Sequence, residues 1–405
     1  MKHPLLNELK LALSKKNLLL FAAALIVILL INRFYYLKAY QQYPEQRLQE
    51  LETEQENALV WSDAYATRLE RLNDMYPGHE DIPDATLMAN IWQHTTSYLQ
   101  ILVNTWQKEP LDTSRILKYE QLLDDQLVEV DQKGIDTGLT GLFRSTKRDW
   151  QQRVQLRSAY KAAGLTEQVN PLQPTGAYLL LDGLKGDSIF SIVLIALVLF
   201  WNFDIWAADF EQSTYLLYFT LPYSRIRLYL NRVIIRTLLT VLGLAALCGF
   251  QFTCGTLWQG SGMDRLVTLN GTAMQTFGFF GMDWQNLQPT DGVVSIGLAI
   301  IAEAVILLFY TLLLIAITSL LSFVTRNLIL TEVLLSAWLI LVMTYVKYPR
   351  ENKAVGYSIL LYFQSGNALS GALGVGIPLL LLLLLLLASV VVHAGACLLV
   401  VHQEL

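Results

Sequence analysis

Six apolar runs alternate with polar segments along the chain, and each is long enough to cross a membrane. A helix needs about 20 apolar residues to span the hydrocarbon core of a bilayer. The runs cover residues 18–37, 188–206, 228–252, 293–320, 328–346 and 375–401. The last run contains unbroken leucine from Leu379 to Leu387. The pattern therefore predicts an all-α membrane protein with six transmembrane helices.

The segment before the first run, residues 1–17, has a different pattern. Its leucines recur at helical spacing and its lysines lie on the other side, which is typical of a helix lying in the membrane interface. A cytoplasmic extension of the first span is the alternative. The run at 18–37 lacks a small-x-small cleavage site and precedes a long polar region, so we interpret it as a retained anchor and not as a signal peptide.

Residues 38–185 form the one long polar region, and their pattern is helical. From Leu48 to Leu72, spacings of three and four residues place one stripe along a helix that Tyr76-Pro77-Gly78 ends. Three further helices are predicted at about 84–108, 112–134 and 139–163, and Asp112 is expected to cap the helix at 112–134. This region therefore reads as a helical bundle of about four helices inserted into a membrane domain that comprises residues 186–405.

Composition and charge agree with this division. The chain is 54% hydrophobic, above the range usual for soluble domains. Residues 38–185 carry 22 acidic and 15 basic residues, whereas the remainder is slightly basic. No basic patch suggests a nucleic-acid partner. The acid-rich run from Glu45 to Glu56 predicts either a solvated face or a surface that attracts cationic peptides.

The positive residues near the span ends set the predicted orientation. With the N-terminus in the cytoplasm, nine Lys and Arg residues lie on the inner side and five on the outer side. Six spans then leave both termini in the cytoplasm and residues 38–185 outside the cell. Loop 347–353 is an exception to the bias, because it carries three positive charges on the outer side.

Motifs for catalysis or metal binding are absent from the sequence. There is no phosphate-binding glycine loop, no zinc-protease motif, no nucleophile elbow, and no ligand spacing among the histidines or the three cysteines. We therefore expect a protein that is not an enzyme and that takes its energy from a gradient or a partner. Arg232 and Arg236 are expected to snorkel to the inner headgroups, and His393 to be a packing residue. Glu303, inside the fourth span, predicts either a structural polar contact or a group in a translocation path.

The polar interruption at 204–227 is the most informative segment. A short helix is predicted from Glu211 to Thr220, with Pro222 ending it and Ser224 capping the third span. The helix would expose an apolar face, which includes Tyr215, Leu216, Tyr218 and Phe219. A short, partly apolar helix between two spans can transmit the movement of a cytoplasmic partner to both.

This segment resembles the cytoplasmic coupling loop of permease subunits of type-2 ATP-binding-cassette (ABC) exporters. The residues that carry the resemblance are Glu211, Thr214, Leu216, Leu217, Leu221, Pro222, Ser224 and Arg225. Ser213 stands where the family commonly has glycine, and Asn231-Arg232 where a lysine is frequent. The layout of an N-terminal interfacial helix, six spans and a large outer domain between the first two spans is similar to one bacterial subgroup.

The resemblance implies a complex in the bacterial cytoplasmic membrane. Two permease chains, identical or related, would pair with two ATPase subunits that hold ATP and Mg, so this chain itself needs no cofactor. The implied ATPase-coupling residues are Asp209, Glu211, Thr214, Tyr215, Tyr218, Phe219, Pro222, Ser224 and Arg225. Residues Pro4–Lys16 would dock on the ATPase as well. The glycine-rich segment Tyr357–Gly376 would form short re-entrant helices, or else an ordinary outer loop.

Two hypotheses from other classes remain open at this point. The large outer domain is also what a membrane-anchored sensor or assembly factor would need to bind a peptide or envelope component. Glu303 is what a gradient-driven secondary transporter would need, although no internal repeat of the kind common in such carriers is visible. The cargo of an exporter is not specified by any residue, and peptides, antimicrobials, lipids and ions are all compatible with the sequence.

Overall fold

The computed structural model describes residues 14–133, 147–186, 188–215, 224–269, 292–347, 365–369 and 378–402. The chain divides into two compact units, which we call the membrane unit (Met1–Tyr36 and Pro174–Leu405) and the inserted unit (Leu37–Gln173). The predicted inserted domain ran to residue 185. The difference is helix α8 (Gly176–Leu184), whose buried residues Ala177, Leu181 and Leu184 belong to the core of the membrane unit.

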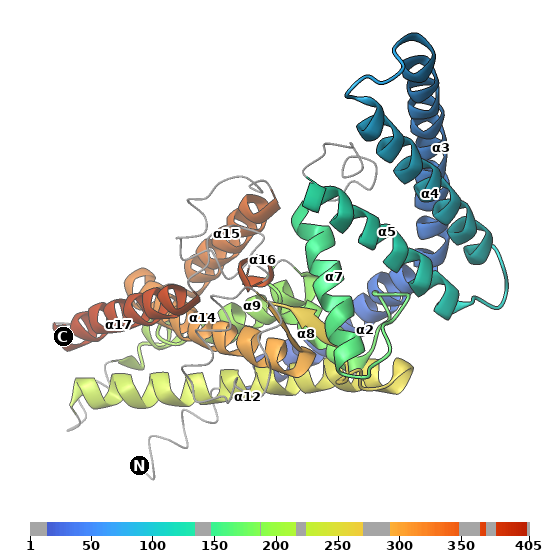
Figure 1. The fold of residues 1–405 in the computed structure, drawn as a ribbon. Helices are drawn as coiled ribbons and strands as arrows, with labels where there is room; N and C mark the ends of the chain where they lie inside the picture. Colours follow the sequence, from blue (N-terminus) through green and yellow to red (C-terminus); the bar gives the residue numbers. More distant parts are fainter. Residues whose placement is uncertain are drawn as a thin grey trace. The chain divides into compact units, whose positions relative to one another are not determined.

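The membrane unit is helical in its described residues apart from one small β-ribbon (Figure 1). Its first helix, α2 (Lys15–Ile31), continues through a π-helical turn, η1 (Asn32–Tyr36). After α8 come, in chain order, α9 (Ile189–Asn202), α10 (Ala207–Glu211), α12 (Arg225–Gln259), α14 (Ile296–Thr325), α15 (Leu328–Lys347), α16 (Ser365–Leu369) and α17 (Pro378–His402).

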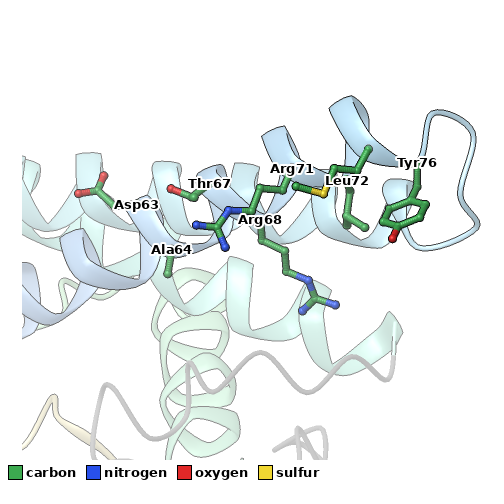
Figure 2. A pocket seen from close by; sticks show the side chains of 8 residues that line it. Asp63, Ala64, Thr67, Arg68, Arg71, Leu72 and Tyr76 are labelled. Atoms are coloured by element: carbon green, nitrogen blue, oxygen red, sulfur yellow. The ribbon is translucent and has the colours of Figure 1, made fainter.

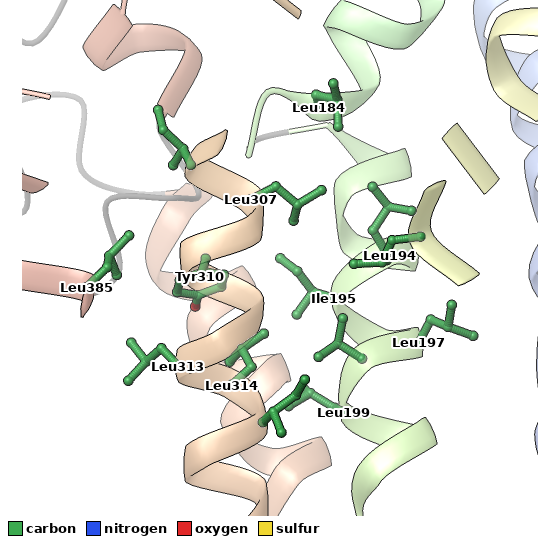
Figure 3. Close-up of a cluster of buried hydrophobic side chains, with 14 of the residues drawn as sticks. Leu184, Leu194, Ile195, Leu197, Leu199, Leu307, Tyr310, Leu313, Leu314 and Leu385 are labelled. Carbon is green, nitrogen blue, oxygen red and sulfur yellow. The ribbon is translucent and has the colours of Figure 1, made fainter. Parts of the chain in front are cut away.

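Helix α14 forms the centre of the membrane unit, because it packs against α8, α9, α12, α15 and α17. The core side chains between α9 and α14 are aliphatic and almost fully buried, as Figure 3 shows for Ile195, Leu307 and Leu314. On the other side of α14, Leu385 of α17 lies near Tyr310 and Leu313. Interdigitation of this kind fixes the spacing of the helices around α14.

Other faces of the same helices expose large apolar side chains, as expected for surfaces in contact with lipid. On α12, every fourth residue of one stripe is exposed: Leu230, Ile234, Leu238 and Leu242. Five described helical segments are long and apolar enough to cross a membrane, and they correspond to the first, second, third, fourth and sixth predicted runs. The fifth run contributes a shorter apolar helix, Leu328–Leu341. The largely helical class is therefore confirmed, with five helices of spanning length among the described residues, and the six-span count stays a prediction.

Two local predictions for the membrane unit were wrong. Residues Val293–Ser295 form strand β2, which pairs antiparallel with β1 (Leu266–Thr268), so the fourth membrane helix begins three residues later than predicted. Three residues, two valines and a serine, are too few to distinguish a strand from a helix start by their spacing. Ser14 is extended and caps α2, so Lys15 and Lys16 belong to the first span and not to a separate helix, and residues 1–13 lie outside the described part.

The inserted unit contains α3 (Leu37–Met75), α4 (Ile82–Trp106), α5 (Thr113–Lys133) and α7 (Lys147–Ala162) among its described residues. Helices α3 and α4 run side by side (Figure 1), and their packing buries Leu51 and Ala58 of the predicted stripe against Trp92 and Leu99. The predicted cap at Asp112 is present, since its Oδ1 accepts from the amide of Arg115 at 3.0 Å.

Candidate functional site

The candidate site is the segment that joins the second span to the third. We call residues Asp204–Thr214 the connector. It begins with a turn after α9, continues as the short helix α10, and ends in a second turn. The amide of Ile205 closes the first turn on the carbonyl of Asn202 at 3.1 Å. Its charged side chains are held by partners on neighbouring helices, and these contacts define the site.

Two arginines of α12 bind the acidic residues of the connector. The side chain of Arg232 is 2% exposed, pairs with the carboxylate of Asp209 and donates to the carbonyl oxygen of Ile205 at 2.8 Å. The side chain of Arg236 is 5% exposed and lies 3.3 Å from the carboxylate of Asp204. The expectation that both arginines snorkel to headgroups was therefore wrong. They lie four residues apart, so they share one helix face, and that face is turned toward the connector.

The first span reaches the same acidic residue from another side. Nζ of Lys16 on α2 lies 2.5 Å from Oδ2 of Asp204 and 4.2 Å from the centre of the Phe203 ring. Asp204 therefore bridges α2 and α12, with Lys16 on one carboxylate oxygen and Arg236 on the other. A carboxylate shared by two cations keeps its charge compensated while both helices are in place.

Trp206 fastens the connector to the central helix α14. Its indole Nε1 donates to the hydroxyl of Ser319 at 3.0 Å, and the hydroxyl of Ser322 accepts from the backbone amides of Trp206 and Ala207 at 3.0 and 2.8 Å. The ring of Trp206 stacks on Tyr229 of α12 at 6.1 Å and lies under the guanidinium of Arg232 at 4.4 Å. The backbone amides at the start of α10 thus donate to a side chain of α14, and they need no water molecule as an acceptor.

Glu211 links the connector to α15. Its Oε1 accepts from the backbone amide of Leu328 at 2.7 Å, which places a carboxylate at the N-terminus of that helix. A negative charge there is favoured by the helix dipole and satisfies an amide that has no partner within the helix. Next to this contact, the guanidinium of Arg326 lies 5.1 Å from the ring centre of Phe210.

The end of the connector differs from the predicted helix Glu211–Thr220. Helix α10 ends at Glu211, and Ser213 has a φ of 56°, the left-handed conformation that favours glycine. The hydroxyl of Thr214 then donates to the carboxylate of Asp209 at 2.9 Å. A helix cannot continue through this turn. Tyr215 follows, with its ring 4.9 Å from that of Phe210, and the predicted residues Leu216, Tyr218, Phe219 and Pro222 lie outside the described residues.

The two remaining predicted coupling residues lie at the start of α12. Ser224 is extended, and its hydroxyl accepts from the amide of Arg227 at 3.3 Å, which confirms it as the cap of this helix. Arg225 donates to the carbonyl oxygen of Val401 at 2.9 Å and so ties the beginning of α12 to the end of α17. Tyr229, one turn further, shares a hydrogen bond of 2.7 Å with Nδ1 of His393 on α17.

Sequence reasoning found the acids of the site but missed most of their partners. The structure adds Lys16, Trp206, Ser319 and Ser322, and it gives Arg232 and Arg236 a new role. A signal was available: two acids five residues apart precede two arginines four residues apart in consecutive apolar runs. Ser319, at the C-terminal end of the fourth run, and Ser322, just after it, are likewise spaced to share a helix face.

Glu303 lies elsewhere, in the N-terminal third of α14. It is 1% exposed, and its carboxylate accepts from the hydroxyl of Ser365 at 2.6 Å. The same hydroxyl accepts from the amide of Gly186 at 3.2 Å. Glu303 therefore takes part in a polar contact that joins α14, α16 and the turn after α8. A role in a translocation path stays a prediction.

Two other candidates among the described residues are a metal site and a pocket on the inserted unit's longest helix, α3. No group of three or more His, Cys, Asp or Glu side chains that could hold a metal ion occurs among them. A hollow of about 510 Å³ runs along the end of the inserted unit's α3 (Figure 2), lined by Asp63, Ala64, Thr67, Arg68, Arg71, Leu72, Met75 and Tyr76. One helix and the residue after it supply the whole lining, so the hollow is a surface depression without a second wall among the described residues.

Comparisons with known proteins add no relative to this picture: no protein-family model, no curated protein and no solved structure matches the chain significantly. Membership of a family is therefore not shown, and the functional proposal is carried by the residues and contacts described above.

Proposed function

We propose that the chain is the membrane-spanning permease subunit of an ATP-driven exporter of the ABC class in the bacterial cytoplasmic membrane. In this proposal, the connector is the element on which a cytoplasmic ATPase acts. Both termini lie in the cytoplasm, and the inserted unit lies outside the cell. Two such chains, or this chain and a related one, form the transport pathway together.

The observation that carries the proposal is the set of links between the connector and four helices. Lys16 attaches it to α2, the pair Arg232 and Arg236 to α12, Ser319 and Ser322 to α14, and the amide of Leu328 to α15. Hydrogen-bonded and ionic contacts of this kind resist separation, so a displacement of the connector moves the attached helices with it. This is the mechanical property required of a coupling element.

Two further observations support the proposal, one from the sequence and one from the structure. The chain has no phosphate-binding glycine loop, so ATP and Mg would be held by the partner subunit. The positive φ of Ser213 also fits the resemblance, because the backbone there adopts the conformation of the glycine that the exporter permeases commonly have at this position.

The test is purification of the full chain from its native membrane in mild detergent, followed by reconstitution in nanodiscs and assay of Mg-dependent ATP hydrolysis. We expect an ATPase subunit to co-purify in equal amount. Replacing Glu211 by alanine removes the contact to α15, so we expect hydrolysis stimulated by the membrane subunit to fall at least tenfold while the ATPase still co-purifies.

Glu332 provides a matched control, since it is an exposed carboxylate on the same helix, α15. Glu332→Ala should leave hydrolysis unchanged. A purified chain that completes transport under an ion gradient alone, or that carries no ATPase, would contradict the proposal. Equal losses in both variants would show that the connector contact has no special role.

A further inference from the structure

The inserted unit contains a cleft whose lining differs from that of a surface depression. It has a volume of about 350 Å³, and three helices and a loop enclose it. Eight of the lining residues are acidic or basic: Arg47, Glu50 and Glu54 from α3, Glu120 and Asp124 from α5, Arg153 and Arg157 from α7, and Glu167 from the loop after α7. Five carboxylates therefore face three guanidinium groups.

All three guanidinium groups already have carboxylate partners within the cleft. Arg157 lies 2.6 Å from Asp124 and 3.0 Å from Glu167. Arg153 lies 3.3 Å from the same Asp124. Arg47, in turn, lies 3.3 Å from Glu50 and 3.6 Å from Glu120. These contacts use four of the five carboxylates.

Glu54 is the carboxylate that remains. Its Oε2 is buried without a hydrogen-bond partner, and the described residues place no cation within ion-pair distance of it. Glu54 as a whole is half-buried, and a carboxylate oxygen shielded from water without a partner is costly because the charge is only partly solvated. Burial accordingly raises the pKa of Glu54 to about 6, against the opposing effect of the nearest cations, Arg47 and Arg153.

The rest of the cleft lining is apolar except for Gln168. Leu123, Leu127, Leu156 and Val169 lie on its walls together with the ring of Tyr43. A ligand that fits such a site combines a hydrocarbon stem with a charged end. The volume is at the lower end of the range for small-molecule pockets, roughly 300–1,000 Å³, so it suits a group of the size of one long side chain.

A divalent metal ion fits this arrangement less well. Calcium is bound by six to eight oxygen atoms and magnesium by an octahedral set. The described residues contain no group of three acidic or other ligating side chains close enough to hold a metal ion, because the arginines lie between the carboxylates of the cleft. An ammonium group needs only one carboxylate and a few further acceptors.

We infer that this cleft binds an alkylammonium group, such as the lysine side chain of a basic peptide, with Glu54 as the carboxylate that receives the charge. The hydrocarbon stem of the ligand lies against the leucines. Glu50 and Glu120 add negative potential along the cleft, where the ammonium group binds. The inference concerns the inserted unit alone and does not depend on the proposed transport function.

The experiment is calorimetric titration of the full chain, held in nanodiscs of zwitterionic lipid, with the peptide trilysine at low salt. Zwitterionic lipid keeps the membrane from attracting the probe itself. We expect saturable binding that weakens at least tenfold in Glu54→Gln. Glu56→Gln removes an exposed charge of the same acid-rich run and is the matched control, for which we expect unchanged affinity.

The dependence on pH gives a second readout. Binding should weaken as the pH falls through about 6, because a protonated Glu54 no longer attracts an ammonium group. The charged groups that face Glu54 across the cleft are the arginines and carboxylates named above. Burial also raises the pKa of the paired Glu120 and Asp124, so the step is assigned to Glu54 only where Glu54→Gln removes it. The circular dichroism of each variant shows whether its helices are intact, and Glu54→Asp, which keeps the charge, should retain part of the affinity.

Three results would overturn the inference. Absence of saturable binding by the folded chain would show that the cleft takes no ammonium group. Equal losses in Glu54→Gln and Glu56→Gln would assign the attraction to general surface charge. Saturable binding of Ca²⁺ that excludes trilysine and requires Glu54 would assign the cleft to a metal ion.

Discussion

Among its described residues the molecule has two charged clusters, one in each unit, and they differ in the balance of their acidic and basic groups. Around the connector, Asp204 and Asp209 are matched by Lys16, Arg232 and Arg236, and the cations come from two different helices. In the cleft of the inserted unit, the carboxylates outnumber the guanidinium groups, and the described residues give Glu54 no partner. The first cluster is closed and joins elements, whereas the second is open and lacks a positive charge.

The difference teaches how to separate a structural charge cluster from a binding one. In a closed cluster, removing one charge leaves its partner buried without compensation, so substitution destabilises the fold. In an open cluster, the excess charge itself lowers stability, so its removal stabilises the fold and abolishes binding. Stability-for-function exchange of this kind is a common property of binding sites.

The largest effect is expected for Arg232→Ala. The change leaves Asp209 without its cation and removes the contacts to Ile205 and Trp206. Breaking one side of a buried ion pair costs about 3–5 kcal/mol, so we expect a marked drop in the thermal unfolding temperature of the full chain in detergent. Arg227→Ala, at an exposed position two residues into the same helix, should unfold like the wild type. A stable Arg232→Ala protein would show that the connector cluster is not closed.

Glu54→Gln should act in the opposite direction. The pKa of Glu54 is raised from 4.5 to about 6 in the folded protein, so the folded state holds this proton more tightly than the unfolded state. The resulting stability is fully present below pH 4.5 and is lost as the pH rises through about 6. The loss corresponds to ~2 kcal/mol, at 1.36 kcal/mol per pKa unit.

The measurement is the difference in free energy of unfolding between Glu54→Gln and wild type at pH 4 and at pH 7.5. We expect the free energy of unfolding of Glu54→Gln to increase relative to that of the wild type as the pH rises. That of Glu56→Gln should show no such increase. A variant that is less stable than the wild type at pH 7.5 would mean that Glu54 has a partner in solution and that the second cluster is closed too.

The smallest effect is expected for Glu211→Gln, which sharpens the comparison at the edge of the connector. The amide side chain can still accept from Leu328 but has no charge for the helix dipole. Charge at a helix terminus contributes about 0.3–1 kcal/mol, and less in high salt. We therefore expect a small loss of stability in low salt that disappears in about 1 M salt, measured by chemical unfolding. A loss that is independent of salt would point to the hydrogen bond and not to the charge.

The sequence predicted the helices better than the contacts between them. Spacing located the second helix of the inserted unit at 84–108, close to Ile82–Trp106, because apolar residues repeat along one face of it. The same reasoning could not place Val293–Ser295 in a strand, since the partner strand lies in another part of the chain. The turn at Ser213 was also missed, because serine carries no preference for the conformation that it adopts there.

The candidate site was found only in part for a similar reason. Asp209 and Glu211 were identified as charges between two apolar runs, which is a local property. The burial of Arg232 depends on which face of α12 turns toward the connector, and a single helix does not determine that. An arginine near the end of a span usually extends its side chain to the headgroups. An ion pair is favoured over this arrangement when an acidic residue of the preceding segment lies within reach.

The closed cluster has a consequence for biosynthesis. Asp209 leaves the ribosome 23 residues before Arg232, its partner on the following helix. Until α12 emerges, Asp209 lacks its arginine partner and Asp204 has only Lys16 among its described partners. An unpaired charge that moved to the centre of a membrane segment would cost about 2.5–3.5 kcal/mol, so these acids hold the end of α9 at the membrane surface until their partners arrive. The second and third spans should therefore enter the bilayer as one helical hairpin. The connector cluster can form only after both spans have been synthesised.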